Sequence, residues 1–531
     1  MSARQLFRFS GGLHLPNLKD LSDHQPLRSL PVPEFLVIPL VDYTGEALHP
    51  AVAQGDSVGK GDILGDPVSG RGVPVRAGSS GTVTALEPRA VAGREQALCV
   101  VLRTDGLDTW SASRPQAIDT PLTATAEELL ERIRQCGVVG LGGAGFPTAD
   151  KIAAARRFGV RTLIINGVEC EPCITCDDRL LRERAAEVVS GIGILRHILG
   201  AEQTLIALEE DRTEAPAAIQ QALRDCADDT TGVVTVPVVY PAGSERQLIL
   251  TLTGQEVPAA GLPIDIGMVC QNAGTAAAVH RAVVLGEPQI SRIVTVTGPG
   301  VRDPRNLEVL IGTAMAELIQ AAGGYAEGVN RLIMGGPMMG LALPDDTLPV
   351  TWATNCLLAD DGTILPETDT VMPCIRCGAC ANACPATLLP QQLYWYARDA
   401  DLEQLRNHHL PDCLECGACD YVCPSHIPLV DHFRAGKAAI RQQDQERQRA
   451  DLARERYQFR QQRLEMQEQD LQERRRRKKD ALRQNRPDPE SLPANGPDPA
   501  TDPRKAAIQA AIARARAKKA GAPDSEGEDE S

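Results

Sequence analysis

CIRCGACANACP at residues 374–385 and CLECGACDYVCP at residues 413–424 are two copies of one cysteine pattern, C-x2-C-x2-C-x3-C-P. This doubled run is typical of proteins that bind two [4Fe–4S] clusters, in which each run supplies three thiolates and the end of the other run supplies the fourth. The pattern therefore predicts one ligand set for each cluster: Cys374, Cys377, Cys380 and Cys423 for the first, and Cys413, Cys416, Cys419 and Cys384 for the second.

Zinc and disulfide bonds account for these eight thiols less well. Structural zinc sites usually use two separated CxxC pairs, without a third cysteine at the same short spacing. Disulfide frameworks are typical of short secreted chains, whereas this chain has 531 residues and begins without the apolar core of a signal peptide. A protein with two iron–sulfur clusters transfers single electrons, so we expect the rest of the chain to contain a group that supplies electrons to the clusters.

The composition indicates a large protein with several domains. A length of 531 residues with 43% hydrophobic residues is enough for several cores, and the net charge of −15 disfavours non-specific nucleic-acid binding. Half of the 16 cysteines lie in the two runs, which favours a reducing cytoplasm. No apolar stretch approaches the roughly 20 residues that span a bilayer, so any membrane association is expected to be peripheral.

A glycine-rich loop marks a second candidate site. Thr125 and Glu128 form a capping-box pattern that opens a helix, and GLGGAGFPT at 140–148 then leads into a second helical segment. Backbone N–H groups in such a loop, together with the helix dipole, hold a phosphate. Helices at 178–199 and 215–225 alternate with strands at 161–167, 204–208 and 233–240, which predicts a parallel sheet. The loop also fits G-x-G-x-x-G, so an ordinary Rossmann NAD site is the alternative.

Three motifs carry a family resemblance. GLGGAGFPT, NGVECEP (166–172) and YPAGSE (240–245) resemble the flavin- and NADH-binding motifs of the complex I flavoprotein subunit. Combined with the doubled cysteine run, they are more similar to the C subunit of the Rnf (Rsx) ion-translocating electron transport complex, as are NGVECEPCITCDDRLLRE (166–183) and the C-terminal KAAIQAAIARA. The segment 292–322 resembles the β-grasp module of the same families. The similarity spans about residues 5 to 520.

The resemblance and the sequence patterns together imply a multidomain α+β protein with five segments. We expect an N-terminal segment and hammerhead-like β-barrel at 1–120, a Rossmann-like α/β FMN/NADH-binding domain at 121–260, a β-grasp (SLBB-type) module at 261–350, an α-helical 2[4Fe–4S] ferredoxin domain at 365–436, and a charged helix with a disordered tail at 437–531. The barrel lacks the lysine that would carry a swinging cofactor, so we expect it to act as a scaffold.

The resemblance also implies a pocket for non-covalent FMN and for NAD(H) as substrate. Its glycines would line the phosphate loop, Lys151 would reach toward the cofactor, and Phe146 would stack on a nicotinamide or adenine ring. The implied cofactor-binding residues are Gly140, Gly142, Gly143, Gly145, Phe146, Lys151, Asn166, Glu169, Glu171, Tyr240, Gly243, Glu245, Asn272 and Thr275. Val168 and Ala154 depart from the complex I motif, which has an acid and a second stacking aromatic there; both changes weaken the NADH inference more than the flavin inference.

A third cysteine group, Cys170, Cys173 and Cys176, lies inside the presumed flavin motif. Its spacing would suit another metal site, but no fourth cysteine with a proline follows, and a cluster there would collide with the flavin. We expect free thiols.

These observations predict an electron-transfer subunit in an ion-translocating oxidoreductase. NADH would deliver hydride to FMN, which would release single electrons to the two clusters. The implied partners are a ferredoxin-like protein and the membrane-embedded and iron–sulfur subunits of the same complex, at the cytoplasmic face of the bacterial inner membrane. That chemistry requires no side-chain acid or base, so we predict no catalytic nucleophile.

Two rival functions and one ambiguous segment remain open on the sequence. A cobalamin reductase of propanediol utilisation resembles the same core, although the C-terminal tail favours Rnf, and an iron–sulfur adaptor without flavin is the non-enzymatic alternative. The basic run 474–479 suits either anionic lipid and acidic partners or a solvated helix face. The acidic end SEGEDES is expected to be disordered.

Overall fold

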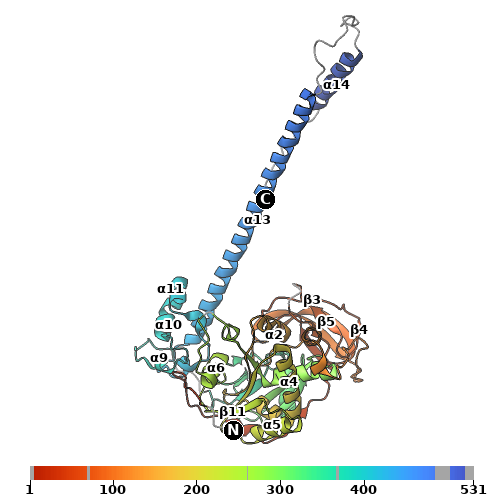
Figure 1. The fold of residues 1–531 in the computed structure, drawn as a ribbon. Helices are drawn as coiled ribbons and strands as arrows, with labels where there is room; N and C mark the ends of the chain where they lie inside the picture. Colours follow the sequence, from red (N-terminus) through yellow and green to blue (C-terminus); the bar gives the residue numbers. More distant parts are fainter. Residues whose placement is uncertain (1–4, 69–71, 260, 366–369, 485–502, 521–531) are drawn as a thin grey trace. The chain divides into compact units, whose positions relative to one another are not determined.

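The computed structural model describes residues 5–68, 72–259, 261–365, 370–484 and 503–520 (Figure 1). These residues separate into two compact units, Met1–Gln442 and Gln443–Ser531, and each unit is described by itself. The predicted proline-rich linker and the predicted disorder of the acidic end lie outside the described residues. In the described ranges no helix is long and apolar enough to cross a membrane.

The N-terminal domain is a small β-structure, as predicted. Its larger antiparallel sheet has the order β2-β8-β7-β4 and contains Phe35–Pro39, Arg94–Thr104, Gly81–Val91 and Ser57–Val58. A three-stranded sheet contains β3 (His49–Pro50), β5 (Ile63–Asp66) and β6 (Val75–Arg76). Leu36, Val83 and Leu102 of the larger sheet are fully buried together with Leu64 of the smaller sheet, and they form the core of this domain.

The second domain is built on a parallel sheet of order β11-β10-β9-β12. Its strands are Thr231–Val236, Gln203–Glu209, Thr162–Gly167 and Met268–Asn272. The helices are α1 (Ala126–Gln135), α2 (Thr148–Arg156), α3 (Cys176–Glu183), α4 (Ala185–Leu199), α5 (Glu214–Asp225), α6 (Glu245–Thr253) and α7 (Ala273–His280). The expected helix 178–199 is two helices, because the backbone leaves the helical region at Arg184 (φ −129°).

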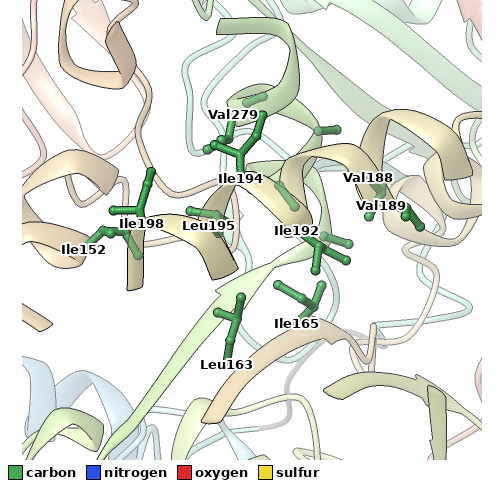
Figure 2. Packing of buried hydrophobic residues seen from close by; sticks show 14 of the residues in the cluster. Ile152, Leu163, Ile165, Val188, Val189, Ile192, Ile194, Leu195, Ile198 and Val279 are labelled. Atoms are coloured by element: carbon green, nitrogen blue, oxygen red, sulfur yellow. The ribbon is translucent and has the colours of Figure 1, made fainter. Parts of the chain in front are cut away.

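Helix α4 forms the main hydrophobic core with the sheet. Its apolar side chains recur three and four residues apart, so Val188, Ile192 and Leu195 lie on one face. Figure 2 shows these side chains gathered with Leu163 and Ile165 of β9. The predicted capping box of α1 is present, because Thr125 Oγ1 accepts from the Glu128 amide and a Glu128 carboxylate oxygen accepts from the Thr125 amide.

The third domain is a mixed sheet of order β1-β14-β13-β17-β15-β16 with one covering helix. Its strands are Arg28–Ser29, Arg305–Leu310, Ser291–Thr297, Cys356–Asp360, Arg331–Met334 and Leu341–Ala342, and its helix α8 is Met315–Ala321. The predicted hairpin and helix over 292–322 are β13, β14 and α8. The short strand β1 comes from the N-terminal segment and pairs in parallel with β14.

The fourth domain is helical, as predicted for the ferredoxin segment. It contains α9 (Ala379–Ala383), α10 (Pro390–Arg398), α11 (Leu402–Asn407), α12 (Ala418–Tyr421) and the start of α13 (Leu429–Gln484). Leu393, Leu405, Leu410 and Phe433 form its core. Beyond Ile440 the side chains of α13 are exposed or half-buried, which fits the predicted charged helix, and α14 (Pro503–Ala520) contains the predicted C-terminal helix.

Candidate flavin and cluster sites

The carboxyl edge of the parallel sheet places two asparagines side by side. Asn166 lies near the end of β9 and Asn272 ends β12, and the two residues are paired in register. Asn166 Nδ2 donates to the Gly243 carbonyl at 2.8 Å, which connects this edge to the loop before α6. Ligands bind at this edge in open α/β sheets because loops and helix N-termini converge there. The predicted residues Asn166, Gly243 and Asn272 therefore lie in one region.

Asn272 has a structural task that its predicted role did not include. Its Oδ1 accepts from the amides of Gly274 and Thr275 and caps α7, while its Nδ2 donates to Asp177 at 2.5 Å. Burial raises the pKa of Asp177 above its usual range, and the hydrogen bond from Asn272 offsets only part of this rise. Both ends of the Asn272 amide are thus occupied by protein groups.

The glycine-rich loop is bound to α7 and requires its glycines. The Leu141 amide donates to Thr275 Oγ1 at 3.0 Å, which brings another predicted residue to the loop. A Cβ at Gly142 would lie 3.2 Å from the Asn272 side chain. Gly143 has a φ of +115°, and a Cβ at Gly145 would lie 1.8 Å from Trp352 Nε1. Larger residues cannot follow this path, so the backbone stays open to a close-lying anion.

The loop leads into α2, which carries Lys151. Pro147 is the residue directly before this helix. Lys151 Nζ donates to Glu245 Oε1 at 2.9 Å and to the Cys270 carbonyl at 2.7 Å. Both side chains of the ion pair are about a third exposed, so solvent screens the pair and it contributes little to stability. Lys151 therefore lies beside the edge strand β12, which carries Cys270.

Glu169 and Glu171 were expected to lie beside flavin and NADH ribose, but protein donors occupy both carboxylates. Glu169 accepts from the amide of Asp177 at 3.0 Å, at the N-terminus of α3. Glu171 Oε1 accepts from the amides of Met338 (2.7 Å) and Met339 (3.0 Å). Their observed contacts hold the loop after β9 in place.

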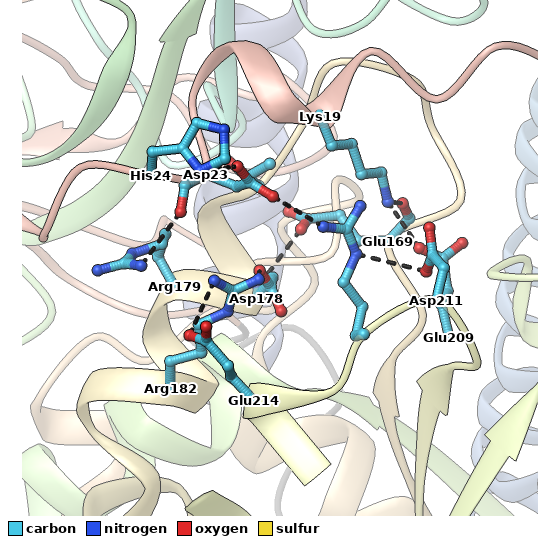
Figure 3. Close-up of polar contacts among 12 residues, drawn as sticks. Lys19, Asp23, His24, Glu169, Asp178, Arg179, Arg182, Glu209, Asp211 and Glu214 are labelled. Carbon is cyan, nitrogen blue, oxygen red and sulfur yellow. Dashed lines mark hydrogen bonds and ion pairs between the residues drawn. The ribbon is translucent and has the colours of Figure 1, made fainter. Parts of the chain in front are cut away.

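A buried lysine stabilises the same loop. Lys19 Nζ donates to the Glu169 carbonyl and to Glu209 Oε2, the latter at 2.6 Å, and Figure 3 shows its side chain reaching both. Lys19 and Glu209 are 3% and 2% exposed, so each charge depends on the other. Burial, followed by the charge of Asp177, raises the pKa of Glu169 to about 7. Sequence analysis missed Lys19, which lies more than a hundred residues from its partners.

The eight cysteines of the doubled run line two separate cavities. Cys374, Cys377, Cys380 and Cys423 surround the first, of about 410 Å³. Cys384, Cys413, Cys416 and Cys419 surround the second, of about 360 Å³. Each cavity takes three cysteines from one run and the fourth from the end of the other, which is the predicted crosswise arrangement.

The geometry of these cavities suits clusters better than single metal ions. Across the described residues no three His, Cys, Asp or Glu side chains converge tightly enough to hold one ion. Zinc needs four sulfurs at about 2.3 Å from one point, whereas a cube of four irons and four sulfides needs them spread around a larger space. The backbone amides of Leu388 and Glu415 donate to the sulfurs of Cys384 (3.3 Å) and Cys413 (3.4 Å). Such bonds stabilise thiolate ligands.

Tyr240 connects the flavin-side loop to the second cavity. Its side chain is 3% exposed, and its hydroxyl donates to the Cys416 carbonyl at 2.5 Å. Burial and the nearby Glu171 raise the pKa of Tyr240, so the hydroxyl keeps its proton. Gly243, three residues further on, contacts Asn166. A single short loop therefore touches both candidate sites.

Cys173 and Cys176 lie in one buried cluster, whereas Cys170 packs elsewhere. Cys170 Sγ accepts from the Gly243 amide at 3.2 Å, whereas Cys176 Sγ donates to Glu169 at 3.2 Å. Burial raises the pKa of both Cys170 and Cys173 to about 12.

Four known families match successive parts of the chain. They are described as the RnfC barrel sandwich hybrid domain (residues 7–107), the Nuo51 FMN-binding domain (133–281), the SLBB domain (293–342) and the 4Fe-4S dicluster domain (370–427). The predicted fold classes of these segments, and the predicted FMN-binding and 4Fe–4S dicluster domains, are therefore confirmed. The match at 133–281 also disfavours the ordinary Rossmann NAD site.

Relatives named as the C subunit of the ion-translocating oxidoreductase complex match most of the chain. Identity is 49% with the Pseudomonas aeruginosa protein (86% of this chain, 59% of that protein), and 43% with the Serratia proteamaculans protein (97% and 70%). With the Yersinia pestis protein it is 46% (87% and 74%). The chain thus spans 59% and 57% of the length of the relatives from P. aeruginosa and Erwinia tasmaniensis. The chain belongs to the RnfC family, the C subunits of ion-translocating oxidoreductase complexes.

Proposed function

We propose that this chain carries electrons between NAD(H), FMN and two [4Fe–4S] clusters, as a peripheral subunit of a membrane complex that couples this chemistry to ion translocation. The observation that carries the proposal is Tyr240, which lies on the loop at the flavin-side sheet edge and donates to the backbone of a cluster cysteine. The family of the chain and its FMN-binding and dicluster domains support it.

The residues of the sheet edge fit the binding of FMN. The loop at Gly142, Gly143 and Gly145 leaves its backbone open, and α2 begins directly behind it, which is the arrangement that binds a phosphate. Lys151 adds a positive charge, and Asn166, whose amide is held by the Gly243 carbonyl and the Val168 amide, lies at the same edge. When bound, FMN supplies the conversion between two-electron and one-electron chemistry.

The arrangement also supports an order for the two clusters. The second cavity is joined to the flavin side by Tyr240 and by Gln247, whose Nε2 donates to the Pro385 carbonyl at 3.2 Å. The first cavity includes the exposed Cys377. We infer that the ligand set Cys384, Cys413, Cys416 and Cys419 holds the cluster that exchanges electrons with the flavin, and that the other set faces the partner.

The proposed partner follows from the same order, whereas the proposed location rests on the family of the chain. An exposed outer cluster suits a second iron–sulfur protein, so a ferredoxin-like protein or another iron–sulfur subunit of the complex is the proposed partner. The proposed location is the cytoplasmic face of the bacterial inner membrane, where NADH is available.

Single-cysteine variants of the holoprotein test both the function and the order. Cys377→Ser should perturb the outer cluster and leave the inner one reducible by NADH, as measured by electron paramagnetic resonance under anaerobic conditions. Cys416→Ser should abolish reduction of the outer cluster by NADH, while dithionite still reduces it. Equal NADH reduction of the outer cluster in Cys416→Ser and wild type would reject the order.

A second variant tests the flavin site separately. Gly142→Asp places a negative charge and a side chain against Asn272, so it should expel FMN while both clusters remain. Flavin absorbance that is bleached by NADH in wild-type protein supports the proposed function. Purified protein that binds no flavin, or whose flavin does not respond to NADH, would overturn it.

A further inference from the structure

The doubled cysteine run is part of a longer structural repeat, in which residues 374–398 and 413–437 follow the same path. Left-handed backbone conformations, which residues other than glycine rarely adopt, recur at equivalent places in both copies. They are found at Arg376 (φ +58°) and its equivalent Glu415 (φ +56°), and at Thr387 (φ +54°) and its equivalent His426 (φ +49°). Because the backbones agree, differences between equivalent side chains show how the surroundings of the two clusters differ.

At the inner cavity, Lys437 of α13 places a positive charge on the backbone of a cluster ligand. Its Nζ donates to the Cys413 carbonyl at 2.6 Å and to Glu415 Oε1 at 2.8 Å. The lysine side chain is 13% exposed, so solvent screens its charge only in part. Burial raises the pKa of the Cys413 thiol, and the Glu415 amide and the charge of Lys437 oppose this rise. The charge therefore acts on the ligand sulfur as well as on its carbonyl.

The equivalent cation beside the outer cavity, Arg398, has a different environment. Its Cζ lies over the ring of Trp395, 5.5 Å from the ring centroid. The position of Glu415 is taken in this copy by Arg376, which lines the outer cavity. Two guanidinium groups repel each other, so Arg376 cannot hold Arg398 against Cys374 in the way that Glu415 holds Lys437. The repeat thus fixes a cation on a ligand at the inner cavity and holds its equivalent on an indole ring at the outer one.

We propose that Lys437 raises the reduction potential of the inner cluster, so that this position accepts an electron from the flavin side more readily. The inference rests on the proposed function, which assigns Cys384, Cys413, Cys416 and Cys419 to the inner cluster. Reduction adds one electron, and hence one negative charge, to a centre whose four ligands are thiolates. A cation fixed beside one of these ligands stabilises the reduced form more than the oxidised form. Lys437 is therefore a positioning residue for electron transfer that acts through its charge.

Two variants of one ion pair separate the effect of charge from that of packing. Lys437→Met removes the positive charge and keeps an unbranched side chain. Glu415→Gln removes the negative charge, keeps an acceptor for the ammonium, and leaves the backbone amide that donates to Cys413 Sγ. Both variants break the same ion pair, so a purely structural role would change the inner cluster in the same direction in both. An electrostatic role requires shifts of opposite sign.

The measurement is an anaerobic redox titration of the holoprotein with chemical mediators, followed by electron paramagnetic resonance. Cys377→Ser identifies the signal of the inner cluster, because it should perturb only the outer one. At a fixed potential, Lys437→Met should lower the ratio of reduced to oxidised inner cluster by about tenfold, which is about 59 mV for a one-electron couple. Glu415→Gln should raise this ratio, and Lys437→Arg should largely retain the wild-type value. Arg398→Met, the matched control from the other copy of the repeat, should change the inner ratio by less than about twofold.

The outcomes distinguish this inference from the proposed function. An inner ratio that Lys437→Met leaves unchanged, or shifts of the same sign in Lys437→Met and Glu415→Gln, would overturn the inference and leave the proposed function intact, because the mediators supply electrons without NADH. If Lys437→Met fails to assemble its clusters, Lys437→Gln, which keeps a donor but no charge, gives the same test. A wild-type flavin that does not respond to NADH overturns the proposed function alone, and wild-type protein without iron–sulfur clusters overturns both.

Discussion

The two cysteine-lined cavities share one sequence pattern but have different surroundings. In the second, Cys416 is 8% exposed, its carbonyl accepts from Tyr240, and a Cβ at Gly11 would lie 2.6 Å from the Cys384 carbonyl oxygen. In the first, Cys377 is exposed and the neighbouring Ile375 is 68% exposed. Spacing along the chain thus determines which thiols gather, whereas packing against the other domains distinguishes an inner cavity from an outer one.

The glycine that follows the second cysteine of each run offers the strongest test of this difference. Gly378 and Gly417 both have positive φ, +81° and +74°. A Cβ at Gly417 would lie 2.6 Å from the Met338 carbonyl, whereas a Cβ at Gly378 would meet nothing within 4 Å. We expect Gly417→Ala to lower the free energy of unfolding by about 4 kcal/mol and Gly378→Ala by about 1 kcal/mol.

Denaturant unfolding of the loaded protein measures both values, and electron paramagnetic resonance shows which cluster is affected. Gly417→Ala should alter only the signal of the inner cluster. Equal losses of stability in the two variants would mean that the inner cavity is not held against the Met338 loop.

The pH dependence of stability gives a second test of this comparison. The buried carboxyl of Glu169 lies on the loop that packs behind the inner cavity. Burial raises the pKa of Glu169 from 4.5 to about 7. The folded protein therefore binds a proton that the unfolded chain releases between these values, and the stability of the fold decreases as pH rises from about 4.5 to about 7. The loss is at most about 3 kcal/mol.

Glu169→Gln should remove this decrease in stability with rising pH. The difference in unfolding free energy between wild type and variant is measured across the same pH range, and wild type should lose stability relative to the variant as pH rises. Asp177 remains in both proteins and interacts with Glu169, so the difference between them reports the titration of this pair. A difference that stays constant with pH would show that Glu169 is ionised throughout.

The hydroxyl of Tyr240 gives the smallest expected effect. Tyr240→Phe leaves the ring in place but removes the hydrogen bond to the Cys416 carbonyl, which should cost about 1 kcal/mol of unfolding free energy. Tyr394→Phe is the matched variant, because Tyr394 lines the outer cavity. Tyr394→Phe should change the free energy of unfolding by less than about 0.5 kcal/mol. A larger effect than that of Tyr240→Phe would contradict the stronger packing of the inner cavity.

Features with a local or periodic pattern could be predicted from the sequence. The Thr125–Glu128 capping box depends on a spacing of three residues, and the parallel sheet follows from alternating helices and strands. The crosswise cysteine sets follow from the repeated spacing, and each set lines one cavity. In each case neighbouring residues, or a repeated motif, contain the physical cause of the structure.

Contacts between distant segments could not be predicted. Glu169 and Glu171 matched a binding motif, yet their observed partners are the N-terminus of α3 and the amides of Met338 and Met339. Tyr43 meets Phe146 only because the barrel packs on the glycine loop. No spacing rule predicts such packing between distant segments.

The N-terminal segment has a consequence for how the protein is made. Gly12 donates its amide to the Ala383 carbonyl at 3.1 Å, and Leu13 pairs with Tyr240, so residues that are synthesised early contact segments next to the inner cavity. A ribosome must release the chain past Ala383 before these contacts can form, and past Cys419 before the inner set of four cysteines is complete. Iron delivery to the inner position is therefore a late event in biogenesis, after translation of all the globular domains, and the cell must keep those thiols reduced until then.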